Sequence, residues 1–515
     1  MNRQILLIVL LMLLSNFNLK AQEDSVISQM IKEAETNSQL EILGQELLDG
    51  IGPRLVGTPQ MKSAHDWAVN KYTQWGIKAK NEKFGTWKGW ERGISHIDML
   101  HPRVQSLQGT QLAWSPSTSK KGVSSEVLIL PKVSDSLEFA QWLPSVKGKI
   151  VMISKLEPTG RPDYNWKEFA TEASFEKMKS ERKDYSESWS QNMKNTGYTY
   201  RNIHEALENA GAVGLISSNW SRGFGSNKIF SARTKKIPTI DLELEDYTMV
   251  YRLSARGQKP IIKITAESKE LGEVPTFNTI AEIKGVDKPN EYVILSAHFD
   301  SWDGGTGATD NGTGTLVMME AMRILKKTYP NPKRTILVGH WGSEEQGLNG
   351  SRSFVEDHPK IVENIQAVFN QDNGTGRVIN ISGQGYLYAY DYIGRWLNQV
   401  PEYVSQHIET DFPGIPGRGG SDYASFIAAG VPAFSLSSLN WSYRNYTWHT
   451  NRDTYDKIIF DDVRNNVVLT VILAYMASED IEFASREKIT LPLSKRSGRQ
   501  MEWPSKRLPN RKGGQ

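Results

Sequence analysis

The chain of 515 residues contains no cysteine, which excludes disulfide bonds, thiolate metal ligands and a lipid attached to an N-terminal cysteine. Long apolar runs are also missing: the run at residues 5–14 is too short to span a bilayer. Because Arg3 precedes this run and small residues follow it, residues 1–21 resemble a secretory signal peptide. The alternative is a retained membrane anchor. We expect a periplasmic or secreted protein with no membrane span in the mature chain.

The chain also lacks a strong excess of charge, since its formal net charge at pH 7 is only +3. Much of the basic excess lies in residues 486–515, a segment rich in Pro, Gly and Ser with no folding pattern. These residues are predicted to form a disordered basic tail. Without a basic groove in the folded body, a nucleic acid is not expected as a partner.

What is present is enough chain for more than one folded unit. From residue 276 onward, apolar strands alternate with helical patterns, which predicts an α/β fold with a doubly wound sheet covered by helices on both faces. We expect strands near 292–297, 334–340, 365–371 and 432–437, and helices near 313–327, 350–357, 393–407, 421–429 and 461–478. We expect residues 22–119 and 269–485 to form this main domain.

Residues 120–268 have a different sequence pattern, in which short apolar strands are separated by polar, aromatic-rich segments. The series KGKIVMI, NAGAVGLI and IPTIDLELED resembles a protease-associated domain, a small β-rich unit found as an insert in exopeptidases. No candidate metal cluster lies within it. We interpret it as a packing insert that narrows access for substrates.

Acidic and imidazole side chains gather at the ends of the predicted strands or in the loops that follow them. Since ligands bind at the carboxyl ends of strands in open α/β sheets, these residues are candidates for one site. A site with two metal ions needs imidazoles, carboxylates, a shared carboxylate and a further carboxylate that accepts a proton. The candidates are His298, Asp300, Asp310, Glu344, Glu345, Asp372 and His449. Each also has an ordinary structural alternative, such as a helix N-cap at Asp310.

Five ordered motifs resemble those of metallopeptidase family twenty-eight, and in particular its carboxypeptidase Q (plasma glutamate carboxypeptidase) group. They are HFDSWDGGTGATDNGTG, WGSEEQG, QDNGTG, GRGGSDYASFIAAGVPAF and WHTNRDTYDKI. The resemblance implies two zinc ions: His298 and Asp372 would hold one, Glu345 and His449 the other, and Asp310 would bridge them.

The same resemblance implies that Glu344 is the general base and that Asp300 orients a ligand imidazole. Arg418 departs from the pattern, because the aminopeptidases of the family have a tyrosine that helps to stabilise the oxyanion there. Arg418 could replace that tyrosine, bind a substrate carboxylate or point to water. Trp302 and the aromatic residues at 441–448 could line an apolar pocket or pack in the core.

We therefore expect a zinc exopeptidase, acting as an aminopeptidase, a dipeptidase or a carboxypeptidase on dipeptides and short peptides. The alternatives are a one-zinc acyltransferase of the glutaminyl cyclase type, which needs fewer ligands, and a non-catalytic receptor-like homologue. The assembly state is left open, with a homodimer among the options.

Overall fold

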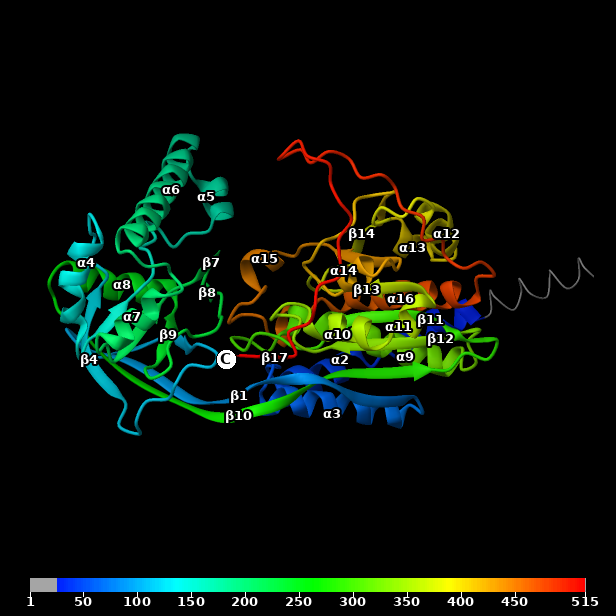
Figure 1. The fold of residues 1–515 in the computed structure, drawn as a ribbon, viewed down its shortest axis with the longest axis horizontal. Helices are drawn as coiled ribbons and strands as arrows, with labels where there is room; N and C mark the ends of the chain where they lie inside the picture. The colour runs from blue at the N-terminus through cyan, green and yellow to red at the C-terminus, as the bar shows by residue number, and fades with distance from the viewer. Residues whose placement is uncertain (1–25, 515) are drawn as a thin grey trace, which may run out of the picture.

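The computed structural model describes residues 26–514, and in it the chain forms two lobes joined by two long strands (Figure 1). The predicted signal peptide lies outside the described residues. Among residues 26–514, none of the helices combines the length and the apolar character that a membrane crossing requires.

The first lobe is a mixed sheet with helices on both faces, which confirms the α/β prediction. Its strands run in the order β15-β14-β16-β13-β11-β12-β10, and the four central ones, β16, β13, β11 and β12, are parallel to their neighbours in this group. The sheet ends at one side with β14 (Val378–Ser382) and β15 (Glu409–Asp411). The first lobe also contains the helical residues 26–36, α2 (Leu40–Gly44), η1 (Gln45–Ile51), α3 (Pro59–Gln74), α11 (Pro359–Glu363) and η4 (Tyr455–Lys457).

Burial on both faces of the sheet explains the continuous apolar runs that made these strands recognisable. In β11 (Lys288–His298), Val293 and Leu295 pack in the core on the side of α9 (Thr313–Thr328) and α16 (Phe460–Glu479). Ile294 points the other way, into the core formed with α10 (Asn349–Asp357) and α14 (Tyr423–Ala428).

One predicted helix, 393–407, is instead two, α12 (Ala389–Leu397) and α13 (Glu402–Ser405). Pro401 separates them, because the residue before a proline is disfavoured in helical conformation. The periodic apolar positions continue across this break, which is why the sequence suggested one helix.

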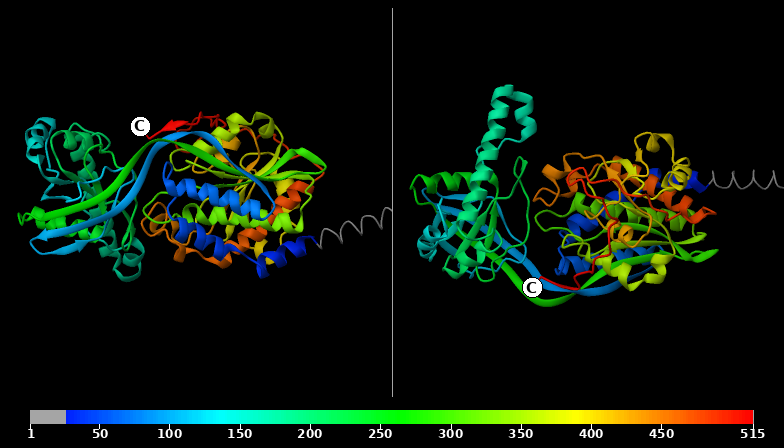
Figure 2. Two further views of the ribbon diagram at one scale, coloured as in Figure 1. Left: turned by 90° about the horizontal axis from the view of Figure 1, so that it is seen from below. Right: turned by 45° about the horizontal axis from the view of Figure 1, so that its top comes forward.

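Strands β1 (Lys78–His101) and β10 (Ile261–Ile283) pair antiparallel along their length and run from the first lobe into the second (Figure 2). The second lobe comprises residues 95–266, so it begins inside β1, before the predicted boundary at 120. Its elements are β2 (Gln105–Leu107), β3 (Gly109–Gln111), β4 (Val123–Ile129), α4 (Ser136–Trp142), η2 (Leu143–Val146), β5 (Ile150–Met152), α5 (Asp163–Phe169), α6 (Glu172–Asn195), α7 (Ile203–Asn209), β6 (Gly214–Ser217), β7 (Trp220–Gly223), β8 (Ser226–Asn227), β9 (Thr239–Leu242) and α8 (Leu244–Ala255).

The polar, aromatic-rich segment of this lobe forms α5 and the long helix α6, which projects away from the rest of the lobe (Figure 1). The second lobe is therefore α/β rather than purely β-rich. Its identity as a protease-associated domain stays a prediction.

The C-terminal residues 486–514 follow the surface of the first lobe, in place of the disordered tail expected from their composition (red in Figure 1). Trp503 packs with its ring centroid 5.6 Å from that of Tyr386, and Arg511 forms ion pairs with Glu356 and Asp357. Strand β17 (Lys512–Gly513) pairs in parallel with β1. Isolated contacts of this kind produce no periodic pattern in the sequence. They could therefore not be predicted from the composition of the segment.

Candidate metal centre

Three parallel strands deliver four of the predicted site residues to one edge of the sheet. His298 ends β11, Glu344 and Glu345 follow β12 (Arg334–Trp341), and Asp372 follows β13 (Ile365–Asn370). The strands pair in parallel, so their carboxyl ends meet.

The other two predicted ligands reach this edge from loops. Asp310 lies in η3 (Ala308–Gly312), just before α9, and His449 follows β16 (Ala433–Ser438) and the short helix α15 (Tyr443–Tyr446). The structure therefore brings together all five residues predicted to bind metal.

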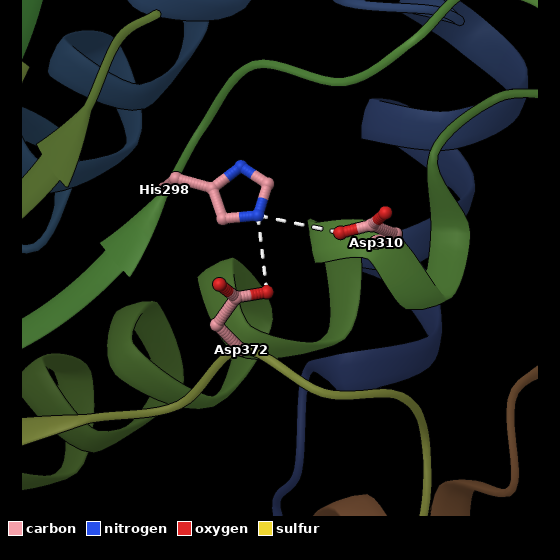
Figure 3. Close-up of side chains that lie close together, drawn as sticks. All are labelled: His298, Asp310 and Asp372. Carbon is pink, nitrogen blue, oxygen red and sulfur yellow. Dashed lines mark hydrogen bonds and ion pairs between the residues drawn. The ribbon is translucent and has the colours of Figure 1, made fainter. Parts of the chain in front are cut away.

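The first ligand group consists of His298, Asp310 and Asp372 (Figure 3). The Nε2 atom of His298 lies 3.4 Å from Oδ1 of Asp310 and 3.1 Å from Oδ1 of Asp372. One imidazole nitrogen thus faces two carboxylates at once. A single proton on that nitrogen satisfies two acceptors poorly, whereas a cation among the three atoms attracts both carboxylates and the nitrogen lone pair.

The second ligand group consists of Asp310, Glu345 and His449. The Nε2 atom of His449 lies 3.2 Å from Oδ2 of Asp310 and 2.9 Å from Oε2 of Glu345. Asp310 therefore belongs to both groups and presents a different carboxylate oxygen to each. This is the arrangement expected of a carboxylate that bridges two ions.

The centre is buried and crowded with like charge. Oδ2 of Asp310 and Oε1 of Glu345 are buried and have no hydrogen-bond partner among residues 26–514. Burial, together with neighbouring carboxylates, raises the pKa of Glu344 and Glu345 well above the ordinary value. Divalent cations would relieve this repulsion, and a set of imidazole nitrogens and carboxylate oxygens fits zinc.

His298 responds to the same charges in the opposite direction. Burial lowers its pKa, but the carboxylates of Asp372 and Glu344 outweigh burial and raise the pKa well above the ordinary value. His449 is less enclosed by acids, and burial lowers its pKa.

The structure changes the role expected of Asp300. Nδ1 of His298 lies 2.9 Å from the backbone carbonyl oxygen of Asp300 but 3.8 Å from its carboxylate. The carboxylate instead accepts hydrogen bonds from the backbone N–H groups of Glu344 (3.0 Å) and Glu345 (3.2 Å). Asp300 therefore orients the imidazole through its main chain and holds the two glutamates through its side chain.

Two further residues that sequence reasoning missed hold the loop of residues 299–312, which we call the Asp310 loop. The carboxylate of Asp453 accepts hydrogen bonds from the N–H groups of Thr309 (2.8 Å) and Asp310 (3.0 Å). The fully buried guanidinium of Arg54 donates to the carbonyl oxygens of Phe299, Thr306 and Gly307 at 2.7–2.8 Å.

Asp453 carried a signal in the sequence, because it lies in the WHTNRDTYDKI motif. Arg54 lies outside all five motifs. A charged residue beside a loop that carries metal ligands can hold the backbone of that loop in place through hydrogen bonds.

Arg418 does not join the site. Its side chain is exposed and donates a hydrogen bond to the carbonyl oxygen of Glu502 in the C-terminal segment. It lines a separate cavity of about 360 Å³ beneath that segment. The loop after Pro416 thus directs Arg418 away from the metal ligands.

The pocket over the metal centre has a volume of about 350 Å³ and is lined by residues of the first lobe. Among its lining residues are the proposed base Glu344, the proposed ligands Asp310 and Asp372, and Arg444 and Trp448.

Trp302 also belongs to the surroundings of the metal centre. Its ring centroid lies 6.2 Å from that of His449, and both rings contact Phe230 of the second lobe. Trp302 therefore packs among core aromatic residues beside the site, whereas Tyr443 and Trp448 line the pocket.

Comparison with known proteins agrees with this geometry. Residues 278–474 match Peptidase family M28. Carboxypeptidase Q of Rattus norvegicus is 27% identical over 456 residues, which cover 87% of this chain and 87% of that protein.

Two solved structures share the fold. The Peptidase M28 precursor from Shewanella amazonensis has a TM-score of 0.64 and 26% identity, and the match covers 90% of this chain and 98% of that one. BSAP, a zinc aminopeptidase from Bacillus subtilis, has a TM-score of 0.54 and 18% identity over 87% of this chain and 97% of that one.

The fold, the site and these matches indicate a zinc-dependent peptide hydrolase, with a region at residues 278–474 that matches peptidase family M28. The chain is carboxypeptidase Q-like, since the similarity to that protein covers 87% of this chain and so includes both lobes.

Proposed function

We propose that the protein is a co-catalytic di-zinc exopeptidase that hydrolyses dipeptides and short peptides in the periplasm or outside the cell. One observation carries the proposal: the two ligand groups share Asp310, which offers one carboxylate oxygen to each. A glutaminyl cyclase-type enzyme with one zinc would not need the group formed by His298 and Asp372.

In this proposal His298 and Asp372 hold one zinc ion, Glu345 and His449 hold the other, and Asp310 bridges them. Bound zinc polarises the scissile carbonyl group and lowers the pKa of a water molecule beside it. All five ligand side chains are at most 13% exposed, so little water competes with substrate for this position.

Glu344 is the proposed general base. It lines the pocket over the metal ligands, and the hydrogen bond from its backbone N–H to Asp300 fixes its main chain. Its carboxylate accepts a proton from the attacking water and then transfers that proton to the nitrogen of the leaving amine. Burial raises the pKa of Glu344, and a higher pKa makes its carboxylate a stronger proton acceptor in the first step.

The second lobe favours short substrates. Ile229 donates a backbone hydrogen bond to the carbonyl oxygen of His449 at 2.8 Å, and Phe230 packs on the same imidazole. The lobe therefore lies directly against a proposed metal ligand, beside a pocket of about 350 Å³ that suits a short peptide.

A panel of dipeptides and tripeptides tests the function, with each terminus free or blocked in turn and with zinc measured in the same preparation. Cleavage of a terminal residue by protein with two zinc ions supports the proposal. Zinc-loaded protein that cleaves no member of the panel, or that cyclises N-terminal glutamine instead, refutes it. Cell fractionation of the native host tests the proposed location.

A further inference from the structure

One side chain at the junction of the two lobes, that of Arg92, contacts the Asp310 loop. Arg92 lies in β1 just before the second lobe begins, where β1 and β10 run from one lobe to the other (Figure 2). Its Nε and Nη2 atoms donate to one carboxylate oxygen of Asp303 at 3.0 and 2.6 Å. Asp303 belongs to the Asp310 loop and precedes the proposed bridging ligand in the chain. The contact therefore joins the connecting strands to the segment that carries Asp310.

The guanidinium group of Arg92 also contacts the second lobe. Its Nη1 atom donates to the backbone carbonyl oxygen of Gln111, the last residue of β3, at 2.6 Å. Gln111 is fully buried, and its side-chain amide donates to the carbonyl oxygens of Ser115 and Pro116 at 3.2 Å. The guanidinium lies 5.0 Å from the ring centroid of the buried Trp90. Because the donors of a guanidinium have fixed directions, this group holds a loop of the first lobe and a strand of the second in a fixed relation.

The position of Asp303 depends on this ion pair because the pair is removed from water. The side chain of Asp303 is only 4% exposed and that of Arg92 is 24% exposed. In the described part of the chain, Arg92 is the only ion-pair partner of Asp303, and the second carboxylate oxygen of Asp303 is buried without a hydrogen-bond partner. Removal of the guanidinium would leave a buried carboxylate without compensation, and such a group moves toward water or toward another donor.

A displacement of this carboxylate would reach the metal ligand because the residues between the two are closely packed. A Cβ atom at Gly304 would lie 2.4 Å from Cγ1 of Ile229 in the second lobe. A Cβ atom at Gly305 would lie 2.6 Å from the carbonyl oxygen of Asp453, which also accepts a hydrogen bond from the N–H of Thr306 at 2.8 Å. Glycine permits these close approaches, so the loop has little free space in which to absorb a shift.

We infer that Arg92 is a positioning residue of the metal centre. It acts through Asp303 to hold Asp310 in the bridging position, and its bond to Gln111 makes that position depend on the second lobe. The inference rests on the ligand set of the proposed function and adds a residue that lies outside the five motifs. Arg92 is not among the residues that line the pocket over the metal centre. It should therefore affect the metal site without affecting contacts with substrate.

Metal-free and zinc-bound protein both provide a test. In metal-free protein, hydrogen exchange followed by mass spectrometry should show faster exchange of residues 299–312 in Arg92→Gln than in wild type. In competition with a zinc chelator, folded Arg92→Gln protein should bind zinc about tenfold to a hundredfold more weakly. At saturating zinc, kcat for alanyl-alanine should fall about tenfold or more, whereas KM should change less than about twofold.

Three further variants separate positioning from a general loss of stability. Arg92→Lys keeps a positive charge opposite Asp303 but lacks the planar fork, so it should recover only part of the zinc affinity. In an Asp303→Asn background, Arg92→Gln should cause less than about a twofold further loss, because its route to the metal ligand has already been removed. Lys88→Gln removes an ion pair with Glu270 at the surface of the same two strands, and it should leave zinc affinity and exchange unchanged.

Wild-type zinc affinity in folded Arg92→Gln protein would overturn the inference, even if the melting temperature were lower, because the ion pair would then serve stability alone. An undiminished further loss in the Asp303→Asn background would overturn it as well. If Arg92→Gln does not fold, Arg92→Lys takes its place and must bind zinc more weakly than wild type. If zinc-loaded wild-type protein hydrolyses no peptide of the panel, the proposed function fails, whereas exchange and zinc affinity still decide the role of Arg92.

Discussion

Asp453→Asn should weaken metal binding although Asp453 binds no metal in our assignment. Its two carboxylate oxygens accept separate hydrogen bonds from the N–H groups of Thr309 and Asp310. An asparagine keeps one acceptor oxygen but presents an NH₂ group to the other N–H. One charge-assisted hydrogen bond is lost, and two donors are brought face to face.

The magnitude follows from these contacts. A hydrogen bond to a charged group contributes about 1.5–3 kcal/mol. If this free energy is lost from the positioning of Asp310, the affinity of the site for metal decreases about tenfold to a hundredfold, because each tenfold change in affinity is about 1.4 kcal/mol. Substitutions of residues that support metal ligands typically fall in this range.

Competition with a zinc chelator, followed by elemental analysis, measures the effect. Asp456→Asn is the matched control, since Asp456 lies three residues away and is exposed. We expect weaker zinc retention in Asp453→Asn and wild-type zinc retention in the control. Wild-type zinc affinity in a folded Asp453→Asn protein would show that the Asp310 loop needs no such support and would refute the reasoning.

Three further predictions follow from the site and the core. Elemental analysis should find about two zinc ions per chain; at most one tightly bound ion in fully active protein would contradict the shared-ligand assignment. Glu344→Gln should keep zinc but reduce kcat about 100- to 10,000-fold, whereas Glu345→Gln should lose zinc; equal zinc loss in both would show that the roles are wrong. Burial lowers the pKa of His65 and His340 to about 3, so as pH falls from 6.5 the unfolded chain binds protons that the folded chain does not, and stability decreases between pH 6.5 and 3. Urea unfolding should show a loss of about 2 kcal/mol per histidine at pH 5 relative to pH 7, and a smaller loss when both are replaced by glutamine.

The metal ligands could be predicted from sequence because strand ends are easy to locate. Apolar runs buried on both faces mark β11, β12 and β13, and the polar residues directly after them must lie at one edge. His298, Glu345 and Asp372 were found in this way. Asp310 and His449 were candidates as well, but their loops do not follow a strand directly, so the motif resemblance was the stronger support for their roles.

Other features depend on contacts between distant segments. Arg54 supports the Asp310 loop from about 250 positions earlier in the chain, and its main partners are carbonyl groups, which have no sequence signature. A substrate contact was one of three alternatives for Arg418, because the sequence around a loop residue does not determine the direction of its side chain. In the structure, the C-terminal segment provides its partner.

The second lobe is more than a packing insert, because the conformation of His449 depends on it. His449 has a φ of 59°, in the left-handed region that is unfavourable for residues other than glycine. Such a conformation costs about 1–3 kcal/mol and persists where neighbouring structure enforces it. The neighbours here include Ile229, which donates to the carbonyl oxygen of His449, and Asn227, which exchanges hydrogen bonds with Asn451. The second lobe therefore helps to hold His449, a proposed metal ligand, in position, so metal binding depends on the interface between the lobes.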